Sequence, residues 1–212
     1  MKNLETRSYT FEVRADDGDN GYILSGRPIV YDQMTDLGFF SEIIDRGALD
    51  NADLKDIRFL VNHNTDMIPL ARSRNNNDNS TMHLTADSAG LSLDWVKLDI
   101  ENNADAKALY SAVKRGDVTG MSFMFSVDAD AWENLDTDHP TRHITEIGTV
   151  VEISAVTFPA YEQTEIYARD KRALDSARSV LESAKDAYNK SVDTDHRSEL
   201  ELLKEKTKIL GV

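Results

Sequence analysis

The 212-residue chain contains no cysteine, which excludes disulfide bonds, thiol nucleophiles and cysteine-based zinc sites. It also has no run close to the roughly 18 apolar residues of a membrane span, and its start, Met1–Ser8, lacks the apolar core of a signal peptide. A chain without cysteine is compatible with a reducing cytoplasm. We therefore expect a protein that stays inside the cell in which it is made and associates with no membrane.

Glycine-rich loops that cradle phosphate groups are absent from the sequence, as is the dinucleotide-binding fingerprint, so we expect no cofactor. Acidic residues outnumber basic residues, 38 to 24, and the net charge is −14. Residues 168–212 hold ten basic and nine acidic residues, so the net charge of residues 1–167 is −15. Because such a charge repels phosphate backbones, we expect no nucleic-acid partner.

The hydrophobic fraction, 40% of the residues, is sufficient for a core. Apolar and polar residues alternate in several short segments, which predicts strands and a mainly β fold with flanking helices, of class α+β. One helix is expected to begin at a cap, Asn102 or Asn103, and to end at Gly116. The expected strand segments are 8–31 (with a turn at 16–21), 57–62, 81–85, 91–98, 121–127, 142–147 and 150–158, with an exposed turn at 74–80 and an acidic loop at 128–140.

From about Ala168 the apolar residues are spaced three and four apart, which is typical of a heptad seam. A polar stretch, Ser191–Asp195, interrupts this spacing. We expect two short helices that pack on the body, on each other or on a partner, because neither is long enough to be stable alone. The chain is thus predicted to divide into a β domain, residues 1–167, and a helical tail, residues 168–212. The seam positions are Leu174, Ala177, Leu181, Ala184 and Tyr188, then Leu200, Leu203, Thr207 and Leu210.

Ser122 lies in a predicted strand whose other face is wholly apolar. Alternation places Met121, Phe123, Phe125 and Val127 on one face, so we expect Ser122 to point away from them into a groove. A serine hydroxyl becomes a good nucleophile when a neighbouring base takes its proton. The alternative, an ordinary serine on an exposed strand face, stays open on this segment alone.

His63 and Glu152 are candidates for the two other groups that such a nucleophile needs. His63 ends an apolar strand and precedes a polar turn, so it is half anchored and half accessible, as a general base must be. Glu152 lies in a segment with apolar residues on both strand faces, where a carboxylate needs a partner such as an imidazole. The alternatives are a surface histidine in a turn and an edge-strand or structurally paired glutamate. Asp66, Ser154 and Glu146 are the other candidates for the third position.

His139 and His143 lie close to Asp136 and Asp138, which raises the alternative of a metal-dependent hydrolase. The preceding stretch, Asp128–Asp130, lacks the glycine and the spacing of a calcium loop. We therefore interpret the segment as a solvated acidic loop and expect no metal site.

Several segments resemble, in their order along the chain, motifs of the prohead serine proteases of tailed bacteriophages, a family related to the herpesvirus assemblins. Gly116–Phe125 is similar to the family's Gly-x-Ser-x-x-Phe strand, and Val151–Ala160 is the most specific match. Ile44–Leu49 is similar to a Pro-Gly-Ala-Phe-type turn, with Arg46 in place of the proline and Leu49 in place of the aromatic residue. The similarity covers residues 8–168 and includes Phe59–Asn64, Ile68–Ala71 and Arg142–Ile147.

The resemblance implies a small closed β-barrel of the herpesvirus-protease type. It also implies that His63 is the base and Ser122 the nucleophile, with Glu152 as the third member where assemblins use a second histidine. The implied function is that of a serine endopeptidase that cleaves the major capsid protein, scaffold segments and itself inside the immature procapsid, in the host cytoplasm. A non-enzymatic capsid assembly or scaffolding protein is the alternative, and homo-oligomerisation stays open. Arg142 is a candidate donor to the oxyanion.

Overall fold

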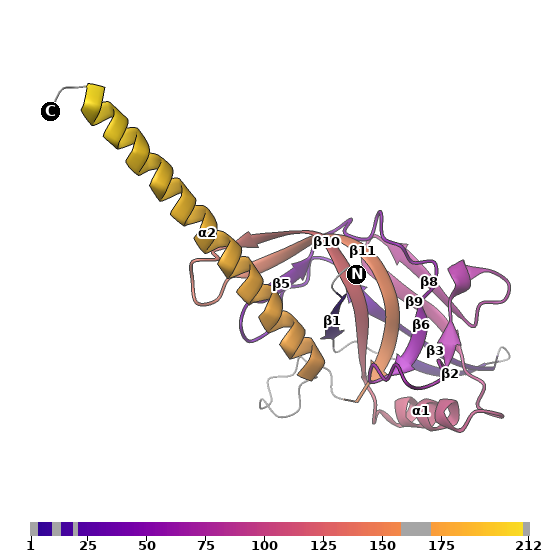
Figure 1. The fold of residues 1–212 in the computed structure, drawn as a ribbon. Helices are drawn as coiled ribbons and strands as arrows, with labels where there is room; N and C mark the ends of the chain where they lie inside the picture. Colours follow the sequence, from indigo (N-terminus) through magenta and orange to yellow (C-terminus); the bar gives the residue numbers. More distant parts are fainter. Residues whose placement is uncertain (1–3, 10–13, 19–20, 158–170, 210–212) are drawn as a thin grey trace.

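In the computed structural model of the chain, the described residues are 4–9, 14–18, 21–157 and 171–209 (Figure 1). They form a mainly β body and two α-helices, which confirms the predicted α+β class. Figure 1 shows that one helix is much longer than the other and extends beyond the body.

A seven-stranded sheet is built around a long antiparallel hairpin, and this hairpin carries Ser122 and Glu152. The hairpin strands are β10 (Gly120–Glu133) and β11 (Thr141–Val156). β1 (Leu4–Tyr9) pairs antiparallel with the other edge of β10, whereas β5 (Ser41–Ile44) and β6 (Arg58–Val61) pair parallel with β11. The short strands β4 (Thr35–Asp36) and β7 (Ala71–Arg72) pair with β5 and β6.

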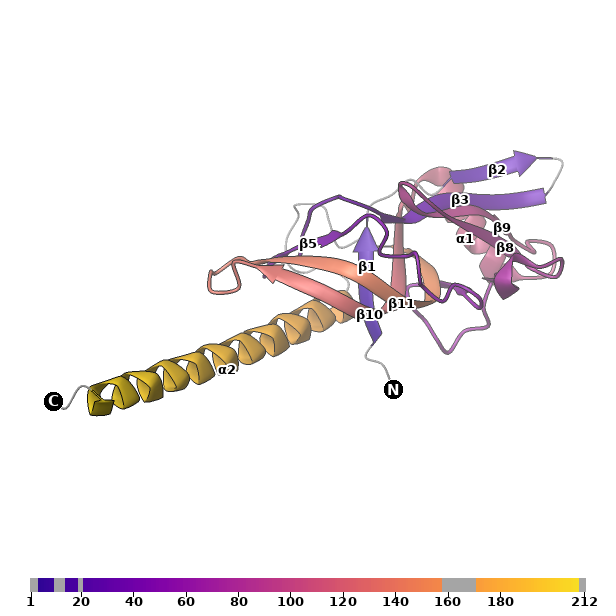
Figure 2. The ribbon, with the colours of Figure 1, turned by 90° about the horizontal axis from the view of Figure 1, so that it is seen from above.

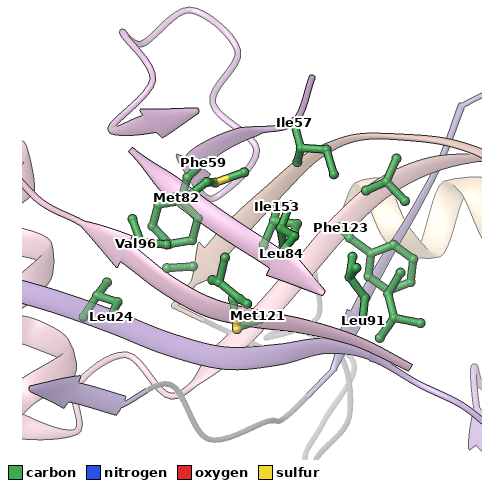
Figure 3. Packing of buried hydrophobic residues seen from close by; sticks show 14 of the residues in the cluster. Leu24, Ile57, Phe59, Met82, Leu84, Leu91, Val96, Met121, Phe123 and Ile153 are labelled. Atoms are coloured by element: carbon green, nitrogen blue, oxygen red, sulfur yellow. The ribbon is translucent and has the colours of Figure 1, made fainter. Parts of the chain in front are cut away.

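A second sheet has four antiparallel strands in the order β2-β3-β9-β8. Its strands are β2 (Arg14–Gly18), β3 (Gly21–Val30), β8 (Met82–Asp87) and β9 (Gly90–Lys97). Figure 3 shows Leu24, Met82 and Val96 of this sheet in one core with Met121 and Phe123 of β10, and all five are fully buried. Burying a large apolar side chain contributes roughly 1.5–3 kcal/mol, so this core holds β10 firmly in place.

The closed barrel that the resemblance implied is not found among the described residues. Their strands belong to two separate hydrogen-bonded sheets. A barrel requires a ladder of hydrogen bonds that continues around the whole sheet. Alternation in the sequence indicates strands, but it does not indicate which strands pair, and so it could not decide between closure and two packed sheets.

Strands β10 and β11 are longer than the sequence pattern indicates. The prediction of an acidic loop at 128–140 is wrong for the first part of that range, because β10 continues to Glu133. The strands expected at 142–147 and 150–158 are one strand, and β2 continues to Gly18, inside the turn expected at 16–21. β-Bulges shift the register of the hairpin several times between Met124 and Asp130. Each bulge adds a residue and changes the face that follows, so simple alternation fails there.

Helix α1 (Ala104–Arg115) is the helix predicted from its caps. The side chain of Asn103 accepts hydrogen bonds from the backbone N–H groups of Asp105, at 3.0 Å, and Ala106, at 3.2 Å. Gly116 ends the helix with a φ of 79°, a left-handed conformation that glycine adopts at little cost. The turn expected at 74–80 is also present and contains a short 3-10 helix, η1 (Arg74–Asn76).

The tail forms one helix, α2 (Lys171–Ile209), so the predicted break at Ser191–Asp195 is wrong. This stretch contains neither glycine nor proline, and polar residues alone do not end a helix. The first part of α2 packs on the body, where Ala177 is buried beside Phe40 and Leu181 packs next to them. Figure 2 shows that the second part extends away from the sheets.

The heptad seam can be followed only over the first part of α2. Ala177 is buried, Ala184 is half-buried and Tyr188 is 39% exposed. The seam therefore stays a prediction. The remaining seam positions, Leu174, Leu200, Leu203, Thr207 and Leu210, lie outside the residues whose side chains the structure describes.

Neither described helix combines the length with the apolar composition that a bilayer-crossing segment requires.

Candidate active site

Ser122 lies near the start of β10, where its backbone is flanked on both sides. Its register partners are Ser8 of β1 and Ser154 of β11. The apolar face predicted for this strand is confirmed, since Met121 and Phe123 are fully buried. Ser122 does not face an open groove, however, because its own exposure is 0%. The hydroxyl is enclosed by the protein.

His63 reaches Ser122 through a tight turn after β6. Asn62 and His63 both have left-handed backbones, with φ of 51° and 54°. Conformations of this kind cost on the order of 1–3 kcal/mol per residue and persist when the surroundings hold them. Here the Asn62 side chain accepts a hydrogen bond from the Thr157 backbone N–H (2.9 Å) and donates one to its hydroxyl (3.1 Å). The turn aims the imidazole into the sheet, where His63 is only 1% exposed and not half accessible as expected.

Glu152 completes a hydrogen-bonded row that we call the Ser–His–Glu row (Ser122, His63 and Glu152). Nδ1 of His63 is hydrogen-bonded to Oε1 of Glu152, and Nε2 lies 2.5 Å from Oγ of Ser122. The Glu152 side chain is 4% exposed, as expected for a carboxylate with an imidazole partner. The imidazole thus joins a carboxylate and a hydroxyl, which is the arrangement that transfers a proton from a nucleophile and orients the base.

Ser154, one of the other candidates for the third position, lies beside the row and supports it. Its hydroxyl donates to Oε2 of Glu152 at 2.8 Å and accepts from the backbone N–H of His63 at 3.0 Å. The two remaining candidates lie elsewhere: Asp66 is exposed in the loop after His63, and Glu146 accepts a hydrogen bond from Asn51 at 3.5 Å. Ser154 therefore fixes both the turn and the carboxylate.

The row also contacts β1 at its backbone. Oγ of Ser122 donates a hydrogen bond to the backbone carbonyl oxygen of Arg7 at 2.8 Å. β1 lies beside β10 at this point, since Ser8 is the register partner of Ser122. No sequence motif signalled this contact, since it joins residues 115 positions apart.

Five charged side chains on and beside β1 form a second group, which we call the charge cluster and which is buried except at Asp130. The Arg7 guanidinium donates to Glu42 at 2.6 and 2.8 Å and to Glu5 at 2.7 Å. The Arg142 guanidinium donates to Glu5 at 2.7 and 3.0 Å and to Asp130 at 2.6 Å. Three carboxylates and two guanidinium groups give the cluster a formal charge of −1. No sequence pattern indicated these ion pairs.

Burial and pairing act in opposite directions on the charge cluster. Burial disfavours ionised Glu5, but the hydrogen bonds and positive charges of Arg142 and Arg7 outweigh it and lower the pKa of Glu5. Burial also disfavours charged Arg142, yet Glu5 and Glu42 raise the pKa of Arg142. Both groups are therefore held charged. Because the donors of Arg142 are bound to carboxylates, we do not assign it a role at the oxyanion.

His139 and His143, considered above for a metal site, each have partners of their own. His143 Nδ1 lies 2.9 Å from an oxygen of Asp45, and His139 Nε2 lies 3.2 Å from the Ser41 hydroxyl. Within the described ranges, no group of three or more histidine, cysteine or acidic side chains is arranged to hold a metal ion.

A hydroxyl, an imidazole and a carboxylate joined in this order inside one sheet are the side chains that define a serine protease. Comparison with known families agrees, since the profile described as caudovirus prohead serine protease matches residues 9–178. The chain belongs to this family. No curated protein and no solved structure matches the chain. The matched span contains the whole Ser–His–Glu row, but it begins only at the last residue of β1.

Proposed function

We propose that the protein is an endopeptidase in which Ser122 is the nucleophile, His63 the base and Glu152 the group that orients His63. The observation that carries this proposal is the continuous row of hydrogen bonds from Glu152 through His63 to Ser122. Ser122 attacks a peptide carbonyl carbon while His63 takes its proton, and His63 then gives that proton to the leaving amine. Water resolves the acyl-enzyme by the same steps in reverse order.

Membership of the prohead protease family supports a role in capsid maturation. We propose that the substrates are the major capsid protein and scaffold segments, cleaved inside the procapsid within the host cell, and that the protease also cleaves itself. These substrates are present at high local concentration inside a closed shell, so a protease enclosed with them needs little affinity of its own.

We further propose that residues 168–212 form a tail that tethers the body to the scaffold or capsid precursor. The boundary expected at 167–168 lies outside the described residues, but α2 packs on the body only over its first part. Deleting residues 190–212 keeps the packed residues Ala177 and Leu181. We expect this deletion to reduce incorporation into shells and to leave peptide cleavage unchanged; normal incorporation would rule out the tether.

A fluorophosphonate probe tests the proposed nucleophile directly. A serine reacts with such a probe at an appreciable rate only when a neighbouring base activates it. We expect a covalent adduct on Ser122 of the full chain, located by mass spectrometry of its peptides. Ser126 is the matched control, because it lies on the same strand and is also 0% exposed. Ser126→Ala should be labelled like the unchanged chain, whereas an adduct of equal yield on Ser122→Ala would contradict the proposal.

A further inference from the structure

Strand β1 occupies one edge of β10, the strand that carries Ser122. β11 covers the opposite edge of β10, and β1 pairs with the remaining edge over six residues. Peptides commonly bind proteins by adding a strand to a sheet edge in this way. The Arg7 carbonyl oxygen accepts the hydrogen bond from the Ser122 hydroxyl, so the backbone of β1 lies next to the nucleophile as a substrate backbone must.

The family match supports a distinction between β1 and the rest of this sheet. The matched span starts at residue 9, so residues 4–8 of β1 precede it, whereas β5, β6, β10 and β11 lie within it. β1 is also an end strand, paired with β10 alone. It can therefore leave the sheet without disturbing another ladder in the described part of the chain.

The side chains of β1 show which peptide fits this edge. Glu5 and Arg7 lie on the same face because strand side chains alternate. Arg7 is 0% exposed and forms its two-pronged ion pair with Glu42 of β5, while Glu5 pairs with Arg142 of β11. The body thus offers a carboxylate for an arginine and a guanidinium for an acidic residue two positions earlier. Ser176 of α2, 3.4 Å from the Arg7 guanidinium, helps to close the first of these subsites.

We propose that β1 marks the substrate strand, and that the protease cleaves after an arginine preceded two positions earlier by an acidic residue. This inference rests on the proposed function and specifies its substrate class. Glu42 selects the arginine, because its two carboxylate oxygens accept two parallel hydrogen bonds from a guanidinium group. A lysine or a neutral side chain cannot donate this pair of hydrogen bonds. Arg142 selects the acidic residue.

In the reaction, Oγ of Ser122 forms a bond to the carbonyl carbon of the substrate arginine, and the bond from that carbon to the next nitrogen breaks. The proton of the hydroxyl passes through His63 to the leaving amine, and water then hydrolyses the arginyl ester to the carboxylate. In the structure the Ser122 hydroxyl donates instead to the Arg7 carbonyl oxygen. β1 therefore occupies the proposed substrate site in the resting protein. As a tethered competitor, it lowers the activity of the chain towards other peptides.

The test uses the full chain and a peptide with the sequence of residues 3–12, carrying a fluorophore and a quencher at its two ends. Cleavage between the arginine and the serine is expected. Replacing the peptide arginine by glutamine should lower kcat/KM at least about 100-fold, and replacing the glutamate two positions before this arginine by glutamine should lower it about 10-fold. In the enzyme, Arg7→Ala should raise kcat/KM for the unchanged peptide about 10-fold, because the competing strand is weakened.

Arg27→Ala is the control for this gain, since Arg27 forms an ion pair with Asp87 in the other sheet. It should leave kcat/KM unchanged. Glu42→Gln should reduce the preference for the arginine peptide over the glutamine peptide at least about 10-fold, whereas a merely structural role would slow both peptides equally.

Equal cleavage of the three peptides, or cleavage at another bond, overturns the inference and leaves the proposed function intact. The absence of peptide cleavage together with fluorophosphonate labelling of Ser122 overturns it as well. If Ser122 is labelled neither in the unchanged chain nor in Arg7→Ala, in which β1 is weakened, the proposed function itself fails. Should Arg7→Ala or Glu42→Gln not fold, the comparison of peptides on the unchanged chain still decides.

Discussion

The Ser–His–Glu row and the charge cluster each include two residues of the β10–β11 hairpin, and they differ in what their side chains can do. Each member of the row can hold or release a proton through a hydrogen bond to the next. The charge cluster instead consists of ion pairs, with two arginines that donate hydrogen bonds to three carboxylates. The row is suited to chemistry, whereas the cluster is suited to recognising charge.

The two groups also differ in where their parts come from. All three members of the row lie within residues 9–178, the span that matches the family. The charge cluster takes Glu5 and Arg7 from β1, which lies before that span, and the rest from β5, β10 and β11. The row is therefore complete without β1, and the cluster is not.

Ser122→Ala provides the largest expected effect and tests the row alone. Removing the nucleophile of a triad lowers kcat by at least about 10⁴-fold. Ser122 lies on the face of β10 opposite the apolar core, so the fold should persist. Cleavage is measured with the peptide of residues 3–12 or by self-processing, and folding by circular dichroism. Ser126→Ala should cleave normally, and normal self-processing by Ser122→Ala would refute the role of Ser122.

Much of the row could be predicted from the sequence because its signals are local. An apolar face opposite Ser122, a strand that ends at His63 and a carboxylate inside an apolar strand each involve only a few neighbouring residues. The imidazole partner expected for Glu152 is present in the structure. What the sequence did not show is that Ser154 supports the row and that β1 encloses it, since both contacts depend on strand pairing.

The charge cluster could not be predicted for the same physical reason. Arg7 and Glu42 are 35 positions apart, and Glu5 and Arg142 are 137 apart, so no local pattern links them. The bulges in the β10–β11 hairpin were also hidden, because they depend on strand pairing. The uninterrupted course of α2 has a local reason instead, since Ser191–Asp195 contains no helix-breaking glycine or proline. Arg142 lies in a segment that resembles the family and was a candidate donor to the oxyanion, a role that its ion pairs do not support.

Glu152→Gln should have the next largest effect and sharpens the distinction between reacting and supporting groups. A neutral amide cannot stabilise the charged imidazole, so kcat should fall about 10³- to 10⁴-fold. Ser154→Ala is the comparison, because it removes one hydrogen bond to Glu152 and keeps the carboxylate. We expect Ser154→Ala to cost roughly 10-fold. Equal losses in the two variants, measured as kcat on one peptide, would contradict a special role for Glu152.

Glu42→Gln tests the charge cluster through stability. Glu42→Gln removes the two-pronged partner of Arg7, but the ion pair of Arg7 with Glu5 remains and the formal charge of the cluster becomes zero, so we expect a cost of about 1–3 kcal/mol. The free energy of unfolding, measured by urea denaturation, should fall by that amount unless β1 leaves the sheet and hydrates Arg7. Hydrogen exchange at residues 4–9 distinguishes the two results. Asp32→Asn is the control, since it weakens an exposed ion pair with Arg46 and should cost about 0–1 kcal/mol.

The smallest expected effect is a dependence of β1 on pH. Because the pKa of Glu5 is lower in the folded protein than its ordinary value of 4.5, Glu5 stabilises the fold fully above that value. This contribution is lost as the pH falls through the lowered pKa. Hydrogen exchange of residues 4–9 should therefore accelerate below about pH 4.5 relative to β11. In Glu5→Gln the extra acceleration should be absent, and an identical pH profile in both chains would show that Glu5 does not hold β1 in place.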